Sequence, residues 1–155
     1  MKRTLTILTA SLLLIGTFLL GGSSHAQGDA ERPSLKAKKT RCTAESVAGT
    51  YAYHGSGTIT QSPAPQIPAG PFTTVGMLTL NADGTFAYKG TRSFNGFIDT
   101  AAQGIGTFTV NNDCTATGID NIGTPYNIVF ADGGNEVYIM FSAPGLVITT
   151  VGKRL

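Results

Sequence analysis

From Cys42 onward, short runs of β-branched and aromatic residues are separated by clusters of Gly, Asn, Asp and Pro, at intervals of roughly 8 to 12 residues. No stretch in this part of the chain repeats apolar residues at helical spacing. This pattern is typical of all-β domains and predicts a barrel or a sandwich. We expect eight strands, at 47–60, 72–80, 85–94, 104–110, 114–120, 125–131, 136–142 and 146–152.

The connections between these strands favour one architecture. Most are short turns, and only the proline-rich 61–71 and the segment 95–103 are long. Within the second of these, 97–103 fits either the extension of a hairpin or an irregular loop. Eight antiparallel strands joined mainly by short turns favour a closed up-and-down barrel, which leaves no sheet edge exposed. A two-sheet β-sandwich is the alternative, and it requires longer crossover connections.

Both faces of the later strands carry apolar side chains. In the seventh expected strand, Val137, Ile139 and Phe141 share one face, while Tyr138 and Met140 share the other with an acidic neighbour. Either the outer face packs on something, such as the preceding segment or a second subunit, or these strands are central and surround an amphipathic interior.

The N-terminus has the composition of a secretion signal. Lys2 and Arg3 precede an apolar stretch at 5–20, which ends in Gly and Ser residues and reaches Ser24-His25-Ala26. We therefore predict a signal peptide at 1–26, cleavage after Ala26, and a secreted or periplasmic protein. The apolar run is shorter than the ~20 residues that a membrane-spanning helix requires, and no later stretch is longer, so we expect no membrane span.

Charge is unevenly distributed in the chain that remains after removal of the predicted signal peptide at 1–26. Segment 27–41 holds five bases and two acids, whereas 42–155 holds four bases and seven acids. We interpret 27–41 as a disordered basic leader and 42–155 as a single domain. The leader permits weak association with an anionic envelope surface, but a plain solvated linker is the simpler interpretation. The acidic balance of the domain argues against nucleic acid as a partner.

Two cysteines, Cys42 and Cys114, remain after signal removal. In an oxidising compartment they predict one structural disulfide between the start of the domain and its fifth strand, with the two Cα atoms within about 7 Å. Metal binding would need further ligands, but His54 is the sole histidine left and no CxxC motif occurs. We predict no metal site and no cofactor.

Several segments resemble a group of small exported bacterial proteins of unknown function. They are Val47-Ala48-Gly49-Thr50-Tyr51, the run 75–80 before Asp83-Gly84, the run 106–110 before Cys114, and 132–137. The resemblance covers residues 42–154, and it implies a compact exported β-barrel without supplying an activity.

A more distant resemblance is to lipocalins and other calycin barrels. In those barrels a Gly-x-Trp pair opens the first strand, and a basic residue from the last strand stacks on the indole. Gly49-Thr50-Tyr51 and Lys153-Arg154 occupy similar places in this chain, which contains no Trp. The resemblance implies an up-and-down barrel with a central lumen.

The candidate binding residues are mainly amphipathic aromatics, which suit a mostly apolar ligand with a few polar contacts. They are Tyr51, Tyr53, His54, Tyr88, Tyr126 and Tyr138. The other charged candidates outside turns are Glu136, Asp99, Lys89 and Arg92. Three further acids lie in turn sequences, where we expect them to cap the backbone: Asp83, Asp113 and Asp132.

These residues support three functional hypotheses. The first is a small β-barrel that binds a small apolar ligand, and the second is a structural or interaction protein of the cell envelope. The third is a cofactor-free enzyme, such as a cyclase or isomerase, with His54 as the base that the sequence nominates. No convergent catalytic motif occurs, so catalytic residues stay unknown and the enzyme hypothesis is the weakest of the three.

Overall fold

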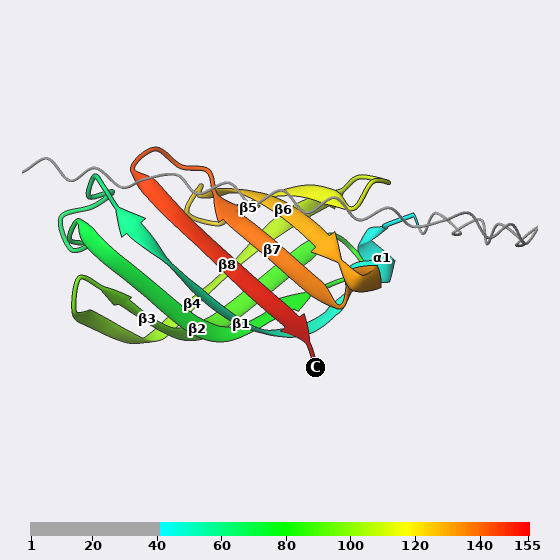
Figure 1. Cartoon of the computed structure of the whole chain (residues 1–155), viewed down its shortest axis with the longest axis horizontal. Helices are drawn as coiled ribbons and strands as arrows, with labels where there is room; N and C mark the ends of the chain where they lie inside the picture. Colours follow the sequence, from blue (N-terminus) through cyan, green and yellow to red (C-terminus); the bar gives the residue numbers. More distant parts are fainter. Residues whose placement is uncertain (1–40) are drawn as a thin grey trace, which may run out of the picture. The chain divides into compact units, whose positions relative to one another are not determined.

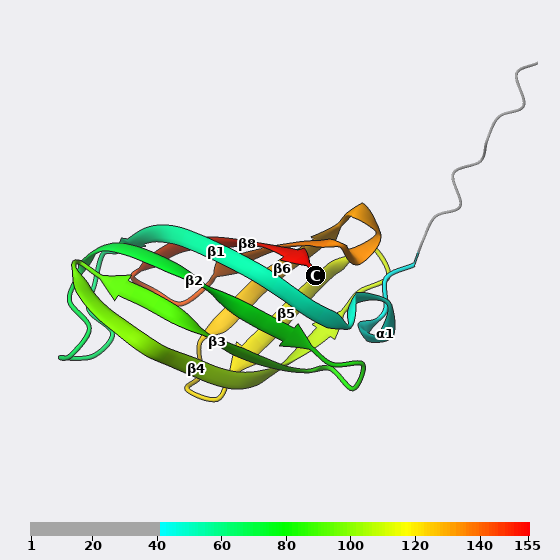
Figure 2. The same ribbon diagram turned by 90° about the horizontal axis from the view of Figure 1, so that it is seen from below.

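The computed structural model describes residues 41–155. The predicted signal peptide at 1–26 and residues 27–40 of the predicted leader lie outside the described residues. The described part forms a closed barrel in which each strand pairs antiparallel with the next and β8 returns to β1 (Figures 1 and 2). This confirms the all-β up-and-down barrel and excludes the two-sheet sandwich.

The strand bounds are close to those predicted from the sequence. The strands are β1 Gly49–Ile59, β2 Gly70–Leu80, β3 Thr85–Phe94, β4 Phe97–Val110, β5 Thr115–Asp120, β6 Pro125–Ala131, β7 Glu136–Phe141 and β8 Leu146–Arg154. The first strand begins later than predicted because Val47 belongs to a short helix, α1 (Ala44–Val47).

Residues 97–103, whose structure the sequence left open, are the first half of the long strand β4. The pairing of β3 with β4 shifts by one residue between Gly90, which faces Ala102, and Arg92, which faces Asp99. The extra residue lies on β4, so this is a β-bulge. A bulge interrupts the regular alternation of side chains and strengthens the local twist, which explains why the segment does not read as a simple strand.

The two ends of the barrel differ. At one end, on the right in Figure 1, lie α1, the last residues of β8 and the 3-10 turn η1 (Asp132–Gly134) between β6 and β7. Thr43 caps α1, since its hydroxyl accepts from the Ser46 backbone N–H while the Ser46 hydroxyl accepts from the Thr43 N–H. We call the end of the barrel that carries α1 and η1 the closed end. At the other end lie the loop 60–69 and the turns 95–96, 121–124 and 142–145.

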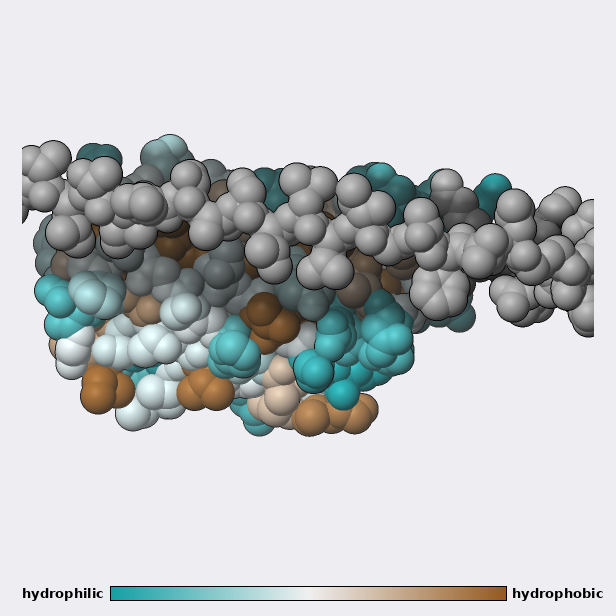
Figure 3. All heavy atoms as spheres, viewed as in Figure 1, coloured by the Kyte–Doolittle hydropathy of each residue, from teal (hydrophilic) through white to brown (hydrophobic). Residues whose placement is uncertain are grey.

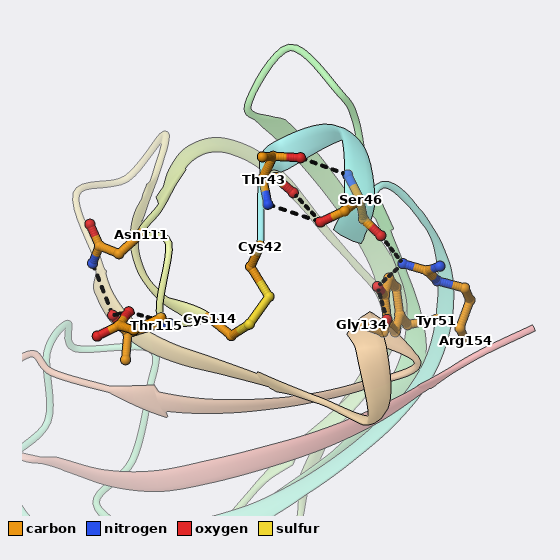
Figure 4. Close-up of a disulfide and its surroundings, with 10 residues drawn as sticks. Cys42, Thr43, Ser46, Tyr51, Asn111, Cys114, Thr115, Gly134 and Arg154 are labelled. Carbon is orange, nitrogen blue, oxygen red and sulfur yellow. Dashed lines mark hydrogen bonds between the residues drawn. A yellow bond between two sulfur atoms is a disulfide. The ribbon is translucent and has the colours of Figure 1, made fainter. Parts of the chain in front are cut away.

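The disulfide predicted from the two cysteines is present at the closed end (Figure 4). Cys42, just before α1, is bonded to Cys114 in the turn between β4 and β5, and their Cα atoms are 4.9 Å apart. Cys42 is buried, with 4% of its surface exposed. The bond therefore ties the entry segment across the end of the barrel instead of bracing one hairpin, as expected.

The interior contains two groups of buried side chains. The larger group fills the half near the closed end and includes Val47, Tyr51, Phe86, Phe130 and Val137. The smaller group, at the loop end, consists of Ile59, Phe72, Phe94 and Ile148.

Glycines in the wall formed by β2 to β4 make room for aromatic rings. A Cβ atom at Gly104 would lie 2.6 Å from the Tyr88 ring, and one at Gly106 would collide with the Phe86 ring. In the same way, a Cβ atom at Gly76 would lie 2.9 Å from the Tyr53 hydroxyl oxygen. Rings that cover strand glycines in this way stabilise positions that would otherwise weaken a sheet.

Candidate functional site

The barrel encloses a cavity of about 560 Å³. Its walls are mostly apolar. Three connections at the loop end also line it, so the cavity opens between these loops. Their lining residues are 63–64, 66–67, 122–124 and 143–144. The volume lies within the ~300 to 1,000 Å³ that small-molecule sites usually have.

One level of the wall is polar, and the strand register builds it. Gly55 on β1 pairs with Thr150 on β8 on one side and with Thr74 on β2 on the other. Thr74 in turn pairs with Arg92 on β3, and Arg92 pairs with Asp99 on β4. We call Thr150, Thr74, Arg92 and Asp99 the polar row. Since paired residues point to the same face of a sheet, the row follows one side of the lumen. Thr74, Arg92 and Thr150 line the cavity directly.

Arg92 and Asp99 form an ion pair within this row. Arg92 Nε donates to Asp99 Oδ2 over 2.9 Å, and Asp99 Oδ1 accepts from the Ala101 backbone N–H over 3.0 Å. The hydrogen bond from Arg92, followed by that from Ala101, lowers the pKa of Asp99. The guanidinium also lies over the Phe94 ring, with Cζ 5.2 Å from the ring centre. Arg92 is therefore a fixed cation at the cavity wall.

Tyr53 and Tyr88 line the cavity beside Arg92. Burial raises the pKa of both phenols above the ordinary value, and the nearby charge of Arg92 opposes this shift in each. A smaller hydrogen-bonding contribution from Arg92 also lowers the pKa of Tyr88 against the effect of burial.

A second polar group in the wall consists of Asp120 and Tyr126. The Tyr126 hydroxyl donates to Asp120 Oδ2 over 2.7 Å, and Asp120 Oδ1 accepts from the backbone N–H groups of Ile122 and Thr124 at 3.1 and 2.7 Å. Burial and the bond to Asp120 raise the pKa of Tyr126 strongly. Asp120 is 6% exposed, and both of its carboxylate oxygens are occupied by donors within the protein.

Thr150 differs from its neighbours because its hydroxyl is unsatisfied. Thr150 is 5% exposed and lines the cavity, yet Oγ1 has no hydrogen-bond partner among the described residues. By contrast, Thr74 Oγ1 donates to the Thr91 carbonyl over 3.1 Å. A buried polar atom without a partner costs roughly 1 to 3 kcal/mol.

Tyr51 lies at the closed end and does not line the cavity. It is fully buried, and its hydroxyl lies 2.7 Å from the Val47 carbonyl and 2.6 Å from the Gly134 carbonyl (Figure 4). Arg154 Nη2 donates to the Tyr51 hydroxyl over 2.9 Å and to the Ser46 carbonyl over 3.0 Å. The guanidinium lies over the Tyr51 ring, 5.4 Å from its centre. Tyr51 therefore closes the barrel floor.

The structure places two of the six candidate residues outside the lumen. His54 alternates with the inward-pointing Tyr53 and is exposed, and Tyr138 is 44% exposed on the outer face of β7. The Tyr138 hydroxyl donates to Glu136, which also forms an ion pair with Lys153 at 3.1 Å. A base at His54 would thus face away from the cavity, which removes it from any chemistry inside the barrel.

Of the candidates, Tyr53, Tyr88 and Tyr126 meet in the cavity, and Arg92 joins them. Thr74, Asp120 and Thr150 were not among the site residues predicted from the sequence. Strand alternation with the correct register would have placed all three on the inner face, but single threonines and a strand-end aspartate carry no motif. Lys89 alternates with Tyr88 and belongs to a shallow outer depression.

Apolar side chains on the outside are scattered between polar ones, as Figure 3 shows for one face. Val129, Met140 and Val147 are 49, 52 and 62% exposed. Val137, Ile139 and Phe141 belong to the interior instead, so the two apolar faces of β7 are divided between lumen and solvent.

Within residues 41–155, no group of three or more His, Cys, Asp or Glu side chains gathers in a way that could hold a metal ion. In the same part of the chain, no helix is long and apolar enough to cross a membrane.

Comparison of the chain with protein-family models and with curated protein sequences finds no match.

Proposed function

We propose that this protein is an exported barrel that binds a small, mostly apolar molecule in its lumen. The cavity of about 560 Å³ that opens between the loops opposite α1 carries this proposal. An interior designed only for stability would be filled, because protein cores contain few voids larger than a water molecule. The mixture of an apolar wall with a few convergent polar groups is that of a ligand site.

The arrangement at the closed end supports a lipocalin-like or calycin-like barrel. A Gly-x-aromatic triplet opens β1, and the basic Arg154 from the last strand covers the aromatic ring of Tyr51. The buried Cys42–Cys114 disulfide supports export to an oxidising compartment.

An envelope interaction role is the second candidate, favoured by exposed apolar residues on adjacent strands. Met140 on β7 and Val147 on β8 are more than half exposed. This role predicts self-association or retention on envelope material. Size-exclusion chromatography with light scattering would show a strict monomer if it is wrong.

Titration with the neutral fluorescent probe N-phenyl-1-naphthylamine tests the binding proposal. Ala102 is 4% exposed and lines the cavity, whereas its neighbour Ala101 is exposed on the outer face. Ala102→Trp should fill the lumen and abolish probe fluorescence, and Ala101→Trp should bind the probe like the unaltered protein. Thermal unfolding of both variants checks that the barrel is intact. Absence of saturable probe binding to the unaltered protein would refute the proposal.

A further inference from the structure

We propose that the lumen selects a neutral ligand whose polar group is a hydrogen-bond acceptor, such as the carbonyl of a ketone, ester or amide, held against Arg92 and Tyr88. This inference rests on the proposed binding function and specifies the ligand for the same cavity. It follows from which polar groups of the wall are already satisfied and from their charges.

The acceptors of the wall are occupied. Asp120 receives three hydrogen bonds, from Tyr126 and from the backbone of Ile122 and Thr124. Asp99 receives two, from Arg92 and Ala101. A ligand that offered only donors would find neither carboxylate free.

Donors are available in the same region. Arg92 uses Nε for Asp99, and its guanidinium carries further N–H donors on the two terminal nitrogens. Tyr88, on the same strand, carries an O–H donor, and both side chains line the cavity. These two side chains thus present N–H and O–H groups to an acceptor oxygen in the lumen.

The polar row gives way to apolar side chains beyond Thr150. Thr150 lies three strands away from Arg92 around the barrel, and its Oγ1 is buried against the Gly55 backbone and does not face the lumen. The row continues from Thr150 to Ile139 on β7 and Ile128 on β6. Both apolar side chains line the cavity and accommodate the rest of the molecule.

The charge balance excludes an anionic head group. Arg92 is the one cation that lines the cavity among the described residues, and it already pairs with Asp99. Asp120 adds a second carboxylate to the wall. A ligand carboxylate would be a third negative group beside one positive group in a largely apolar space, where repulsion is weakly screened. A carbonyl oxygen gains the same hydrogen bonds without this cost.

Displacement of N-phenyl-1-naphthylamine by decane, 2-decanone and decanoate at neutral pH tests the inference. We expect 2-decanone to displace the probe at about tenfold lower concentration than either of the others, the effect of one hydrogen bond to a charged donor. Tyr88→Phe should reduce this advantage severalfold while probe affinity is retained. Tyr138→Phe, which removes a hydroxyl on the outer face, is the matched control and should change nothing.

The outcomes separate the two proposals. If the probe does not bind, the lumen is no ligand site and both fall. If the probe binds and decanoate is the best competitor, or decane equals 2-decanone, binding stands and the neutral-acceptor inference is overturned. Retention of the full ketone preference in Tyr88→Phe, with an unchanged melting temperature, would also overturn it.

Discussion

Cys114 occupies the same place in the turn between β4 and β5 that Gly84 occupies in the turn between β2 and β3. Both residues have a left-handed backbone, with φ of 70° at Cys114 and 82° at Gly84. In each turn the residue donates its N–H to an asparagine carbonyl three positions earlier, at 3.0 and 3.1 Å. Left-handed φ suits glycine and is unfavourable for a residue with a Cβ atom.

The surrounding sequence repeats as well. Asn81, Asp83 and Thr85 in one turn correspond to Asn111, Asp113 and Thr115 in the other, thirty positions later. In both turns the asparagine side chain donates to the threonine hydroxyl over 2.9 Å, and the aspartate Oδ1 accepts from the threonine N–H and hydroxyl. The two hairpins therefore share one design, and the cysteine takes the glycine position of the second copy.

This relationship predicts how the disulfide should be replaced. Two double variants remove the disulfide, Cys42→Ala/Cys114→Ala and Cys42→Ala/Cys114→Gly. Because the disulfide joins residues 72 positions apart, its loss should lower the free energy of unfolding by about 4 kcal/mol in the chain-entropy model. The glycine version should be more stable than the alanine version by about 1 kcal/mol, because it relieves the left-handed residue. Urea unfolding of the two double variants measures the difference. Equal stabilities would show that φ at this position does not matter.

Two glycines of the barrel wall should respond differently to the same substitution. Gly57→Ala places a Cβ atom 2.6 Å from the Ile148 Cα and against the Val147 carbonyl, so the backbone must move. We expect the free energy of unfolding to fall by about 3 kcal/mol or more. Gly104→Ala meets the outer end of the Tyr88 ring, which can turn into the cavity. We expect it to lose less than about 1 kcal/mol of stability but to weaken probe binding.

Chemical unfolding and probe titration of both variants check this contrast. If Gly104→Ala is as destabilising as Gly57→Ala, the cavity beside Tyr88 does not accept the displaced ring.

The Tyr126 hydroxyl should contribute to stability through Asp120. Tyr126→Phe keeps the ring and removes one of the three donors to a buried carboxylate, which should cost about 1 to 3 kcal/mol. Tyr138→Phe is the control, since its bond to Glu136 is exposed, and it should cost only a few tenths of a kcal/mol. Guanidinium unfolding of both variants gives the comparison. A similar small loss in both would mean that Asp120 finds another donor.

Stability should fall at alkaline pH because of the tyrosines in the lumen. Burial raises the pKa of Tyr53, Tyr88 and Tyr126 in the folded protein, whereas in the unfolded chain they ionise near 10.0. Above that pH the unfolded state releases protons that the folded state retains, so stability is complete below pH 10 and is lost as pH rises further.

Urea unfolding across this range, with tyrosinate absorbance followed in parallel, provides the test. Replacing Tyr126 with Phe should flatten the loss of stability, because one of the three groups no longer titrates. A stability that stays constant above pH 10 would contradict the assignment of these phenols to a buried site.

The sequence was sufficient for the fold because its turns are explicit. Asp83-Gly84 and Asn121-Ile122-Gly123 mark chain reversals, and the alternating runs between turns fix strand number and order. It left 97–103 undecided, where the bulge opposite Gly90 and Arg92 breaks the alternation, and it missed α1, whose four residues are too few to show a periodic pattern.

The candidate site was only partly predictable, because pattern alone does not say which face of a strand is inside. Tyr53 and His54 are adjacent and must point to opposite faces, so they cannot both line one lumen. Register then decides the rest. Thr150 is linked to Arg92 through Gly55 and Thr74, and the Gly55–Thr150 pair joins residues nearly one hundred positions apart in the chain. Such long-range pairings leave no local signature.

Both chain ends of the barrel are on the side away from the cavity opening. Cys42 enters beside α1, and Leu155 follows β8 next to Thr50, to whose carbonyl it donates its N–H over 2.9 Å. A linker attached at Leu155, to a sensor surface or to a reporter protein, would therefore leave the mouth facing free solution. The barrel can be immobilised by its C-terminus for ligand screening without obstructing the opening of the cavity.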